Sequence, residues 1–477
     1  MEVLTPDLCV IGAGSGGLSV AAAAAAFGVP VVLIERDKMG GDCLNTGCVP
    51  SKALLAAAKR VEAIRNAGPF GIKSQRPTID FRQVHDHVHQ VIDAIAPNDS
   101  RERFTGLGVR VIEGTARFKD ARTVVVDDDK FEIKARRFVI ATGSTASVPP
   151  IPGLDETPYL TNESVFDLRA LPKQLIIIGA GPIGLELAQA FQRLGSEVTV
   201  LEAAQPLAKD DPECAQVVLD QLDRDGVVVR SGVRIHSVAR QRTRVFVTLA
   251  AGEDAAPETI EGSHLLVATG RRPVLEDLDL EKARIKAEKR GVVVDKTLRT
   301  TNKRVFAIGD VAGGLQFTHV ASAHAGIVIR RALFRLPAKF DASAVPWVTY
   351  TEPELAQVGL TEAEARKSHK NLRILRWPYH ENDRAQAERE THGHIKVVAS
   401  HRGKILGVSI VGPAAGELIG TWTLALRQGL KIRAMTDFIL PYPTLSEIGK
   451  RAAISFYAPG AASPLVRRII AMLRWFG

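Results

Sequence analysis

The chain has 477 residues, enough for about three domains that each bury a core of their own. Hydrophobic residues make up 45% of it and charged residues 24%, which excludes a disordered protein, and four cysteines are too few for a small secreted disulfide framework. The net charge of +9 leaves a nucleic-acid or anionic-membrane partner open. Residues 1–7 lack the basic region of an export signal, and no apolar run is long enough to span a bilayer, so we expect a cytoplasmic protein.

A glycine-rich pattern opens the chain. Residues 8–11 predict a short buried strand, GAGSGG follows at 12–17, and an alanine-rich helix comes next. A second strand, at 31–34, ends on Glu35. In such a unit the three glycines allow a tight turn, close approach of a pyrophosphate and helix packing, while the acid binds a ribose hydroxyl. The pattern glycines are Gly12, Gly14 and Gly17.

Two cysteines follow this unit, ahead of a helix predicted over 53–65. Five residues of regular helix rise about 7.5 Å, beyond the usual Cα reach of a disulfide, so Cys43 and Cys48 can be bridged only if Cys43 precedes the regular turns. The helix N-terminus, and Lys52 on the same face as Cys48, would stabilise a thiolate. The alternative is two buried cysteines that are close by accident.

The glycine pattern occurs a second time. Residues 175–178 predict a strand, GAGPIG follows at 179–184, and the next strand, 198–201, ends on Glu202 at the same interval as in the first copy. The glycines of this copy are Gly179, Gly181 and Gly184. Two copies in register predict two dinucleotide-binding units far more specifically than one copy would.

Each copy also contains a later strand that ends in a small-residue turn. These segments read FVIATG at 138–143, with Thr142 and Gly143, and LLVATG at 265–270, with Gly270. The first copy is longer by about 40 residues, and the extra residues include the cysteine segment. The repeated scaffold therefore predicts two bound dinucleotides, and the extra segment is expected to hold the chemistry.

The segment GGDCLNTGCVPSK at 40–52, with both glycine patterns, both ATG turns and AIGD at 307–310, resembles the flavin-dependent pyridine nucleotide–disulfide oxidoreductases. This family includes dihydrolipoamide dehydrogenase, glutathione reductase and mercuric reductase, and the resemblance covers residues 5 to about 457. It implies an α/β fold with two Rossmann-type domains, for FAD and NAD(P), and a C-terminal α+β domain that forms a homodimer. The expected domains are an FAD domain with the cysteine helix (1–150), an NAD(P) domain (151–272), a segment completing the FAD domain (273–339), an interface domain (340–457) and a basic tail (458–477).

The resemblance also implies roles for individual residues. Cys43 would be the interchange thiol that meets the acceptor, and Cys48 the charge-transfer thiol against the flavin. Lys52 would lie near the flavin N5, paired with Glu186, and Asp310 would bind the ribityl region. The other expected FAD residues are Gly12, Gly14, Gly17, Glu35, Ala116, Thr142, Gly143, Thr318 and His319. The expected nicotinamide nucleotide residues are Gly179, Gly181, Gly184, Glu202 and Gly270.

The C-terminal part departs from the family pattern. Most members have a His-Pro whose histidine is an acid/base held by a glutamate; here Glu447 is present, but the histidine position is Tyr442. A tyrosine with a pKa of about 10 is a poor base near neutrality, although its hydroxyl can still form a hydrogen bond, or simply pack. Tyrosine here, and the stretch 383–385, resemble mercuric reductases; those enzymes end in a vicinal cysteine pair, whereas the last cysteine here is Cys214. The acceptor is therefore left open among disulfides, metal ions and electrophiles.

Glu202 bears on the choice of nicotinamide coenzyme. A carboxylate there would bind a 2′-hydroxyl and repel a 2′-phosphate, and residues 203–207 contain no Arg or Lys. We therefore expect NADH in preference to NADPH. Two rival functions are a flavin-direct NADH:quinone or small-electrophile reductase and a non-catalytic flavoprotein whose disulfide senses oxidants.

Histidines do not predict a metal site. His85 and His89 share a helix face without a nearby cysteine, which favours a solvated or dimer-facing helix. His392 and His394 precede a strand at 395–398, and a hairpin with outward histidines is expected.

The excess positive charge is concentrated at the C-terminus. From residue 448 onward no acidic residue occurs, and the basic residues are Lys450, Arg451, Arg467, Arg468 and Arg474. Apolar residues of 465–476 form one helical stripe opposite arginines, so residues 461–477 predict either a peripheral contact with an anionic membrane or a helix packed on the dimer. Nucleic acid is not expected, because no aromatic–basic stacking surface accompanies the charge.

Overall fold

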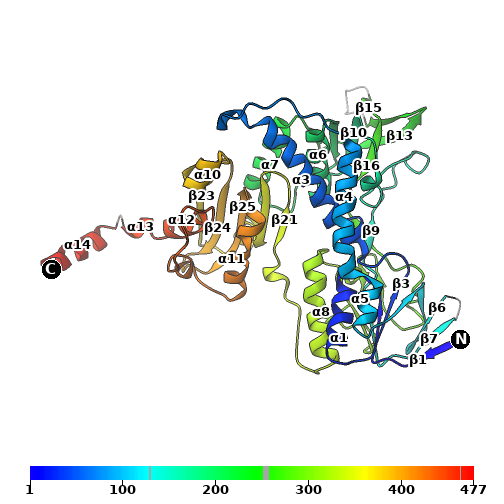
Figure 1. Ribbon diagram of the computed structural model, residues 1–477. Helices are drawn as coiled ribbons and strands as arrows, with labels where there is room; N and C mark the ends of the chain where they lie inside the picture. Colours follow the sequence, from blue (N-terminus) through cyan, green and yellow to red (C-terminus); the bar gives the residue numbers. More distant parts are fainter. Residues whose placement is uncertain (128–129, 251–256, 462, 477) are drawn as a thin grey trace. The chain divides into compact units, whose positions relative to one another are not determined.

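Figure 1 shows the computed structural model, which describes residues 1–127, 130–250, 257–461 and 463–476. The chain divides into two compact units. The first unit comprises Met1–Gly179, Ala190–Leu201 and Val233–Asp341, and the second unit comprises Ala180–Gln189, Glu202–Gly232 and Ala342–Gly477. None of the helices in the described ranges has the length and apolar character needed to cross a bilayer.

A five-stranded parallel sheet forms the centre of the first unit, in the order β20-β8-β2-β3-β4. Its strands are β2 (Leu8–Ile11), β3 (Val31–Glu35), β4 (Arg110–Glu113), β8 (Arg137–Ile140) and β20 (Val305–Ala307). Since successive side chains of a strand point to opposite faces, Leu8 and Val10 pack toward the helices α1 (Ser15–Ala26) and α8 (Thr318–Ala332). Cys9 and Ile11 pack in the core cluster on the other face. Both faces are apolar, which is why the strand reads as a continuous hydrophobic run.

That second core cluster includes residues of a four-stranded sheet, ordered β1-β7-β6-β5. Its strands are β1 (Glu2–Leu4), β5 (Ala116–Asp120), β6 (Thr123–Val126) and β7 (Phe131–Ile133). The sheet lies at the N-terminal end of the chain in Figure 1.

The second glycine pattern also begins a parallel sheet. Strand β10 (Gln174–Ile178) pairs with β11 (Glu197–Glu202) and with β16 (His264–Val267), and the helix α6 (Pro182–Leu194) lies between β10 and β11 in the sequence. An antiparallel sheet of β13 (Ile235–Gln241), β14 (Arg244–Leu249) and β15 (Thr259–Gly262) shares a core cluster with it. The two ATG turns are joined by pairing of β9 (Ser144–Ala146) with β17 (Arg271–Pro273).

The extra segment of the first copy is helical. It contains α2 (Gly41–Asn45), α3 (Cys48–Arg65), α4 (Phe81–Ile95) and α5 (Arg101–Gly106). The helix predicted over 53–65 thus starts earlier, at Cys48, while Cys43 lies in the separate helix α2, before the regular turns of α3. His85 and His89 share a face of α4, as predicted, and their rings stack with centroids 4.0 Å apart. The expected solvated or interface position is wrong for His85, which is buried within this unit.

The second unit contains an antiparallel sheet in the order β21-β22-β25-β24-β23. Its strands are β21 (Trp347–Thr349), β22 (Glu354–Gly359), β23 (Leu372–Pro378), β24 (His394–Ser400) and β25 (Ile405–Gly412). The helices of this unit include α7 (Pro212–Arg224), α9 (Glu362–Ser368), α10 (Asp383–Glu388), α11 (Ala415–Arg427) and α12 (Glu447–Ser455). Ile419 and Trp422 of α11 and Ile448 of α12 pack in one core cluster with the sheet.

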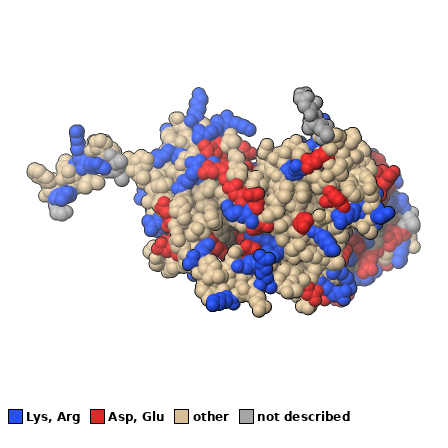
Figure 2. Space-filling view, turned by 90° about the horizontal axis from the view of Figure 1, so that it is seen from above, with Lys and Arg blue, Asp and Glu red and all other residues tan. Residues whose placement is uncertain are grey.

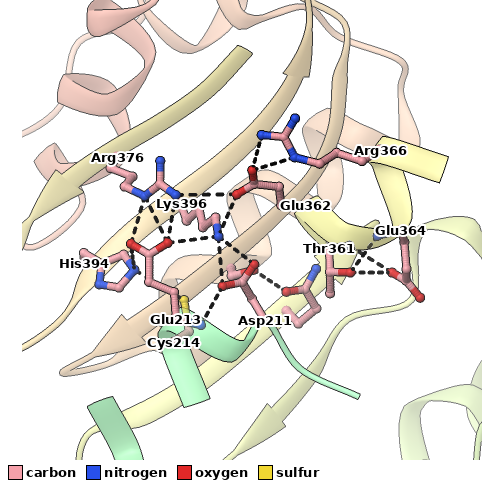
Figure 3. A network of polar contacts seen from close by, with 12 residues as sticks. Asp211, Glu213, Cys214, Thr361, Glu362, Glu364, Arg366, Arg376, His394 and Lys396 are labelled. Carbon is pink, nitrogen blue, oxygen red and sulfur yellow. Dashed lines mark hydrogen bonds and ion pairs between the residues drawn. The ribbon is translucent and has the colours of Figure 1, made fainter. Parts of the chain in front are cut away.

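A buried lysine joins the sheet to helix α7 (Figure 3). The Nζ atom of Lys396, on β24, lies 2.9 Å from Asp211, 3.0 Å from Glu213 and 2.9 Å from Glu362. Burial alone would lower the pKa of Lys396, but the hydrogen bonds to the three carboxylates raise it above its usual value. Lys396 is therefore a cation, and it neutralises carboxylates at the starts of two helices, α7 and α9.

His394 differs from the prediction of an outward-facing side chain. Its Nε2 atom lies 3.5 Å from the Cys214 thiol and 3.5 Å from Glu213, and its side chain is only 15% exposed. Cys214 and Glu213 are both distant from His394 in sequence, which explains why the local pattern did not reveal this.

The C-terminal segment forms α13 (Ala458–Ala461) and α14 (Pro464–Leu473), coloured red in Figure 1. Residues 462 and 477 of the predicted tail lie outside the described residues. Every residue of α14 is exposed, and Trp475 and Phe476 beyond it are 86% and 82% exposed. Figure 2 shows arginines and no acidic side chain on the visible face of this segment.

The substitution Lys396→Met should lower the stability of the protein by about 3–5 kcal/mol, because it leaves the buried carboxylate of Asp211 without its cation. The urea midpoint measures this, with Lys370→Met at an exposed position as the control. Equal midpoints for the two variants would show that the network contributes little.

Candidate functional site

The first glycine loop is shaped by close backbone contacts. Gly12 has a φ of +102°, and a Cβ atom there would lie 2.4 Å from the carbonyl oxygen of Ala141. A Cβ atom on Gly17 would lie 1.9 Å from the Gly12 oxygen. At Gly14 the nearest atom to such a Cβ would be the Cα of Gly41, at 4.0 Å. Gly12 and Gly17 are therefore needed by the fold, whereas the space at Gly14 suits the approach of a ligand.

The cysteine segment starts against this loop. The Gly40 N–H donates to the Ala13 oxygen at 3.0 Å, and a Cβ atom on Gly41 would lie 2.7 Å from the Gly14 Cα. The close approach to Gly14 leaves no room for a side chain at 41, and Gly40 has a positive φ, so the sequence GG at 40–41 fixes where α2, with Cys43, begins.

The acid of each copy holds its own glycine loop. Glu35 accepts the Ala13 N–H at 2.6 Å, and Glu202 accepts the Ala180 N–H at 2.7 Å. The other oxygen of Glu202 accepts the Ala204 N–H at 2.8 Å. Since a carboxylate offers about four acceptor positions, both acids can still bind a ribose hydroxyl.

The second glycine loop has the same geometry as the first. Gly179 has a φ of +109°, and a Cβ atom there would lie 2.5 Å from the Ala268 oxygen. Cβ atoms on Gly181 and Gly270 would meet no described atom within 4 Å, and Gly184 is buried in α6. The second copy thus leaves the same open backbone as the first.

The structure brings Cys43 and Cys48 together as two thiols. Cys48 is the first residue of α3, and its Sγ lies 3.6 Å from the hydroxyl of Thr318, the first residue of α8. The hydrogen bond donated by Cys43 lowers the pKa of Cys48 to about 6 against the effect of burial; Thr318 and the charge of Lys52 contribute in the same direction. The positive end of α3 also favours an anion at this position.

Cys43 has the opposite tendency. Its hydrogen bond to Cys48 raises the pKa of Cys43, and burial raises it further. The opposite shifts therefore favour a proton on Cys43 and a thiolate at Cys48. Cys9 and Cys214 are buried, and burial raises the pKa of both thiols.

Polar side chains that the sequence analysis missed clamp the cysteine segment. The Asn162 amide donates to the Asp42 carboxylate at 2.9 Å and to the Thr46 oxygen at 3.2 Å. Arg271 lies 3.3 Å from Asp42 and 3.8 Å from Asp310, so it joins the cysteine segment to the AIGD motif. The positions of Asp42 beside Cys43, and of Arg271 directly after the second ATG turn, were the available signals.

Some of the predicted FAD residues lie near Asn162 and Arg271, the side chains that hold the cysteine segment. Ser144 donates to Asp310, whose pKa is raised by burial, and the Thr142 hydroxyl donates to the Val274 oxygen at 2.8 Å. Gly143 has a φ of +69°. His319 stacks on Phe317 with ring centroids 5.2 Å apart. Ala116 is buried in the core between the two sheets, so only its backbone is available to a ligand.

Of the remaining predicted site residues, Lys52 lies in the first unit. Glu186, Tyr442 and Glu447 lie in the second unit. Glu186 is buried and accepts the Tyr350 N–H at 2.9 Å; its pairing with Lys52 stays a prediction. Tyr442 is 70% exposed, and its hydroxyl donates to Asp383 at 2.6 Å. This hydrogen bond raises the pKa of Tyr442, as does the charge of Glu447 at the start of α12.

The Asn382 side chain holds the Tyr442 loop beside α10. It accepts the Ala385 N–H at 2.9 Å and donates to the Thr444 oxygen at 3.0 Å. Asn382 is buried, so α10 and the loop that carries Tyr442 are joined by a fixed contact. The tyrosine is therefore positioned by its surroundings although its ring is exposed.

Replacement of Cys43 by Ala should raise the pKa of Cys48 toward the ordinary thiol value of about 8.5, because the main stabilising hydrogen bond is lost. Cys43→Ser keeps a hydroxyl donor and should retain more of the lowered pKa. The pH dependence of Cys48 alkylation in the reduced protein, assigned by fragment mass spectrometry, measures both. Identical profiles in parent, Ala and Ser variants would contradict the assigned hydrogen bond.

Two family models match the chain. Residues 6–325 match the pyridine nucleotide-disulphide oxidoreductase model, and residues 345–453 match the dimerisation domain of the same family. The chain is 36% identical over 456 residues to a mercuric reductase of Streptomyces lividans, covering 94% of this chain and 96% of the relative. It is 39% identical over 453 residues to a dihydrolipoyl dehydrogenase of Thermus scotoductus, covering 93% and 95%.

A solved structure shows the same fold. The HOCl-induced flavoprotein disulfide reductase RclA from Escherichia coli matches with a TM-score of 0.83 at 29% identity, covering 94% of this chain and 99% of that one. The α/β fold with FAD and NAD domains is confirmed, and the matched dimerisation domain supports a homodimer. The chain therefore belongs to the pyridine nucleotide-disulphide oxidoreductases and is a flavin-dependent disulfide oxidoreductase.

Proposed function

We propose that Cys43 and Cys48 are the redox pair through which this enzyme passes electrons from NADH to an acceptor. One observation carries the assignment: a thiol with a pKa of about 6 lies at a helix start, hydrogen-bonded to a second thiol of raised pKa. Contacts of GG at 40–41 hold the pair beside the first dinucleotide loop. Two buried cysteines that are close only by accident would not be expected at a helix start beside this glycine loop.

The residues present fit the two dinucleotides that the family implies. Bound FAD would accept a hydride equivalent from the nicotinamide and supply two electrons to the disulfide. The proposed FAD residues are Gly12, Gly14, Gly17, Glu35, Lys52, Ala116, Thr142, Gly143, Asp310, Thr318 and His319. The proposed nicotinamide nucleotide residues are Gly179, Gly181, Gly184, Glu202 and Gly270. The open backbone at Gly14 and Gly181 supports both sets.

Reduction of the disulfide produces one thiol and one thiolate. Two electrons break the S–S bond; Cys43 takes up one proton, and Cys48 remains a thiolate. When Cys43 acts on the acceptor, its proton can pass along the existing hydrogen bond to the Cys48 sulfur. Lys52 and Thr318 stabilise the Cys48 thiolate whenever the proton lies on Cys43.

Tyr442 limits the choice of acceptor. Its hydroxyl proton is donated to Asp383 and its pKa is raised, so it cannot act as a base near neutrality. We therefore propose an acceptor that needs no base at this position, namely a thiophilic metal ion or a small electrophilic oxidant. The relatives named mercuric reductase and the HOCl-induced reductase are consistent with this class.

Glu202 supports NADH as the electron donor. Its two oxygens accept the N–H groups of Ala180 and Ala204, which fixes a negative charge at the end of β11. A 2′-phosphate at the adjacent ribose would meet this charge, whereas a 2′-hydroxyl can donate to it.

Steady-state oxidation of NADH and NADPH against mercuric ion, hypochlorite-type oxidants, small disulfides, lipoamide and quinones tests the function. We expect a higher kcat/KM with NADH, turnover with metal ion or oxidant, and loss of that turnover by at least about a hundredfold in Cys43→Ser or Cys48→Ala.

Three outcomes would overturn parts of the proposal. Full activity of Cys43→Ser with quinones indicates flavin-direct reduction. Rapid two-electron reduction without turnover of any acceptor indicates a sensor. Efficient lipoamide turnover contradicts the role assigned to Tyr442.

We propose further that the protein is cytoplasmic and that its C-terminal segment binds an anionic membrane surface peripherally. Helix α14 exposes Leu465, Ile469 and Leu473, each more than 40%, and carries arginines without acids. Trp475 at its end has the amphipathic ring typical of the membrane interface. In the rival arrangement, α14 would pack on the dimer and bury the same apolar residues.

Flotation with anionic and neutral vesicles tests the tail. The full chain should float with anionic vesicles only; removal of residues 461–477, or Ile469→Ser with Leu473→Ser, should abolish this, and Arg467→Gln with Arg468→Gln should weaken it. Equal flotation of the full and truncated chains excludes the membrane contact.

A further inference from the structure

A basic cavity lies in the first unit at one end of the strands β5 and β6, labelled in part in Figure 1. Its volume is about 540 Å³, within the range of small-molecule sites. Four chain segments line it: the hairpin turn 120–123, residues 134–135, the loop around 282–284 and residue 304. Its charged lining residues are Asp120, Arg122, Lys134, Lys282, Arg284 and Arg304. None of these residues belongs to the cysteine site or to the glycine loops.

Hydrogen bonds fix the walls of this cavity. The Asn302 amide donates to the Ala121 oxygen and to the Ala283 oxygen, both at 3.0 Å, and so joins the hairpin turn to the opposite loop. The Asp120 carboxylate accepts the backbone N–H of Arg122 at 2.7 Å. One lining acid is therefore already used to shape the turn, and the cavity does not have to form around a ligand.

The positive charge in the cavity is only partly neutralised. Lys134 pairs with Glu132 at 2.6 Å, and Lys282 pairs with Asp279 at 2.7 Å. Within the described ranges, the guanidinium groups of Arg122, Arg284 and Arg304 have no carboxylate within 4.0 Å. Three arginines of one cavity thus form no ion pair with a described carboxylate, and Asp120 is the one acid among the lining residues.

The positive field continues behind Arg304. Burial lowers the pKa of Arg137, and repulsion by nearby guanidinium groups lowers it further. These groups belong to Arg136, Arg299, Arg304 and Arg335. Like charges are held together here by the fold, and a bound anion would relieve their repulsion.

We propose that this cavity binds a small polyvalent phosphate, such as an oligophosphate or a phosphorylated metabolite, at a site separate from both dinucleotides. Guanidinium groups bind phosphate oxygens in pairs, and three arginines without a carboxylate partner among the described residues match several negative charges. A merely solvated basic face would be convex and would place its arginines apart. A large acidic protein surface would not fit a cavity of this size.

Titration calorimetry with tripolyphosphate tests the proposal on the FAD-loaded enzyme saturated with NAD⁺, so that the dinucleotide sites are filled. We expect one site per chain, and affinity that falls as salt rises. Arg284→Gln with Arg304→Gln should weaken binding at least about tenfold, because two charge-assisted hydrogen bonds are lost. If the double variant is unstable, Arg284→Gln alone, which changes an exposed side chain, should also weaken tripolyphosphate binding.

The control is Arg60→Gln with Arg82→Gln, which changes the net charge equally at exposed positions of α3 and α4. Sulfate at equal ionic strength is the second control. Binding that is equal in the pocket and control variants, or no tighter for tripolyphosphate than for sulfate, overturns the proposal. Since NADH oxidation does not enter the measurement, the result is independent of the proposed function.

Discussion

The contact between the backbones of Gly14 and Gly41 determines the geometry of the catalytic part of the molecule. A side chain at position 41 would collide with the dinucleotide loop, so helix α2 would start farther away. The position of α2 sets Cys43, and the break before α3 sets Cys48 at a helix start. The first glycine loop and the segment that carries the thiols are thus parts of one rigid contact, further held by Asn162 and Arg271.

Charge is used differently in the two units. In the second unit Lys396 and Arg376 are matched by carboxylates, so that buried charge holds strands and helices together. In the first unit arginines gather around the cavity at 120–123 with few acids, and in the tail no acid follows residue 447. The net charge of +9 therefore reflects local basic surfaces that can meet anions, and not a uniformly basic protein.

Local patterns predicted the parallel strands, because glycine turns and apolar runs act over short distances, and they gave the condition for a Cys43–Cys48 bridge that the break before α3 meets. They did not predict the partners of those elements. His394 lies against Cys214 and Glu213, about 180 residues away, and His85 is covered within its own unit. Asn162 reaches Asp42 of the cysteine segment across 120 residues. Such contacts depend on the packing of distant elements, which hydrophobic periodicity does not encode.

The bond between Glu202 and the Ala180 N–H has a consequence for attempts to engineer coenzyme choice. Truncating this acid would remove its negative charge and would also leave that N–H without its acceptor, which releases the glycine turn. Glutamine, which is neutral but keeps an acceptor oxygen, separates the two effects. The negative charge at the end of the second strand and the order of the glycine loop thus depend on one side chain in both copies, because Glu35 holds Ala13 in the same way.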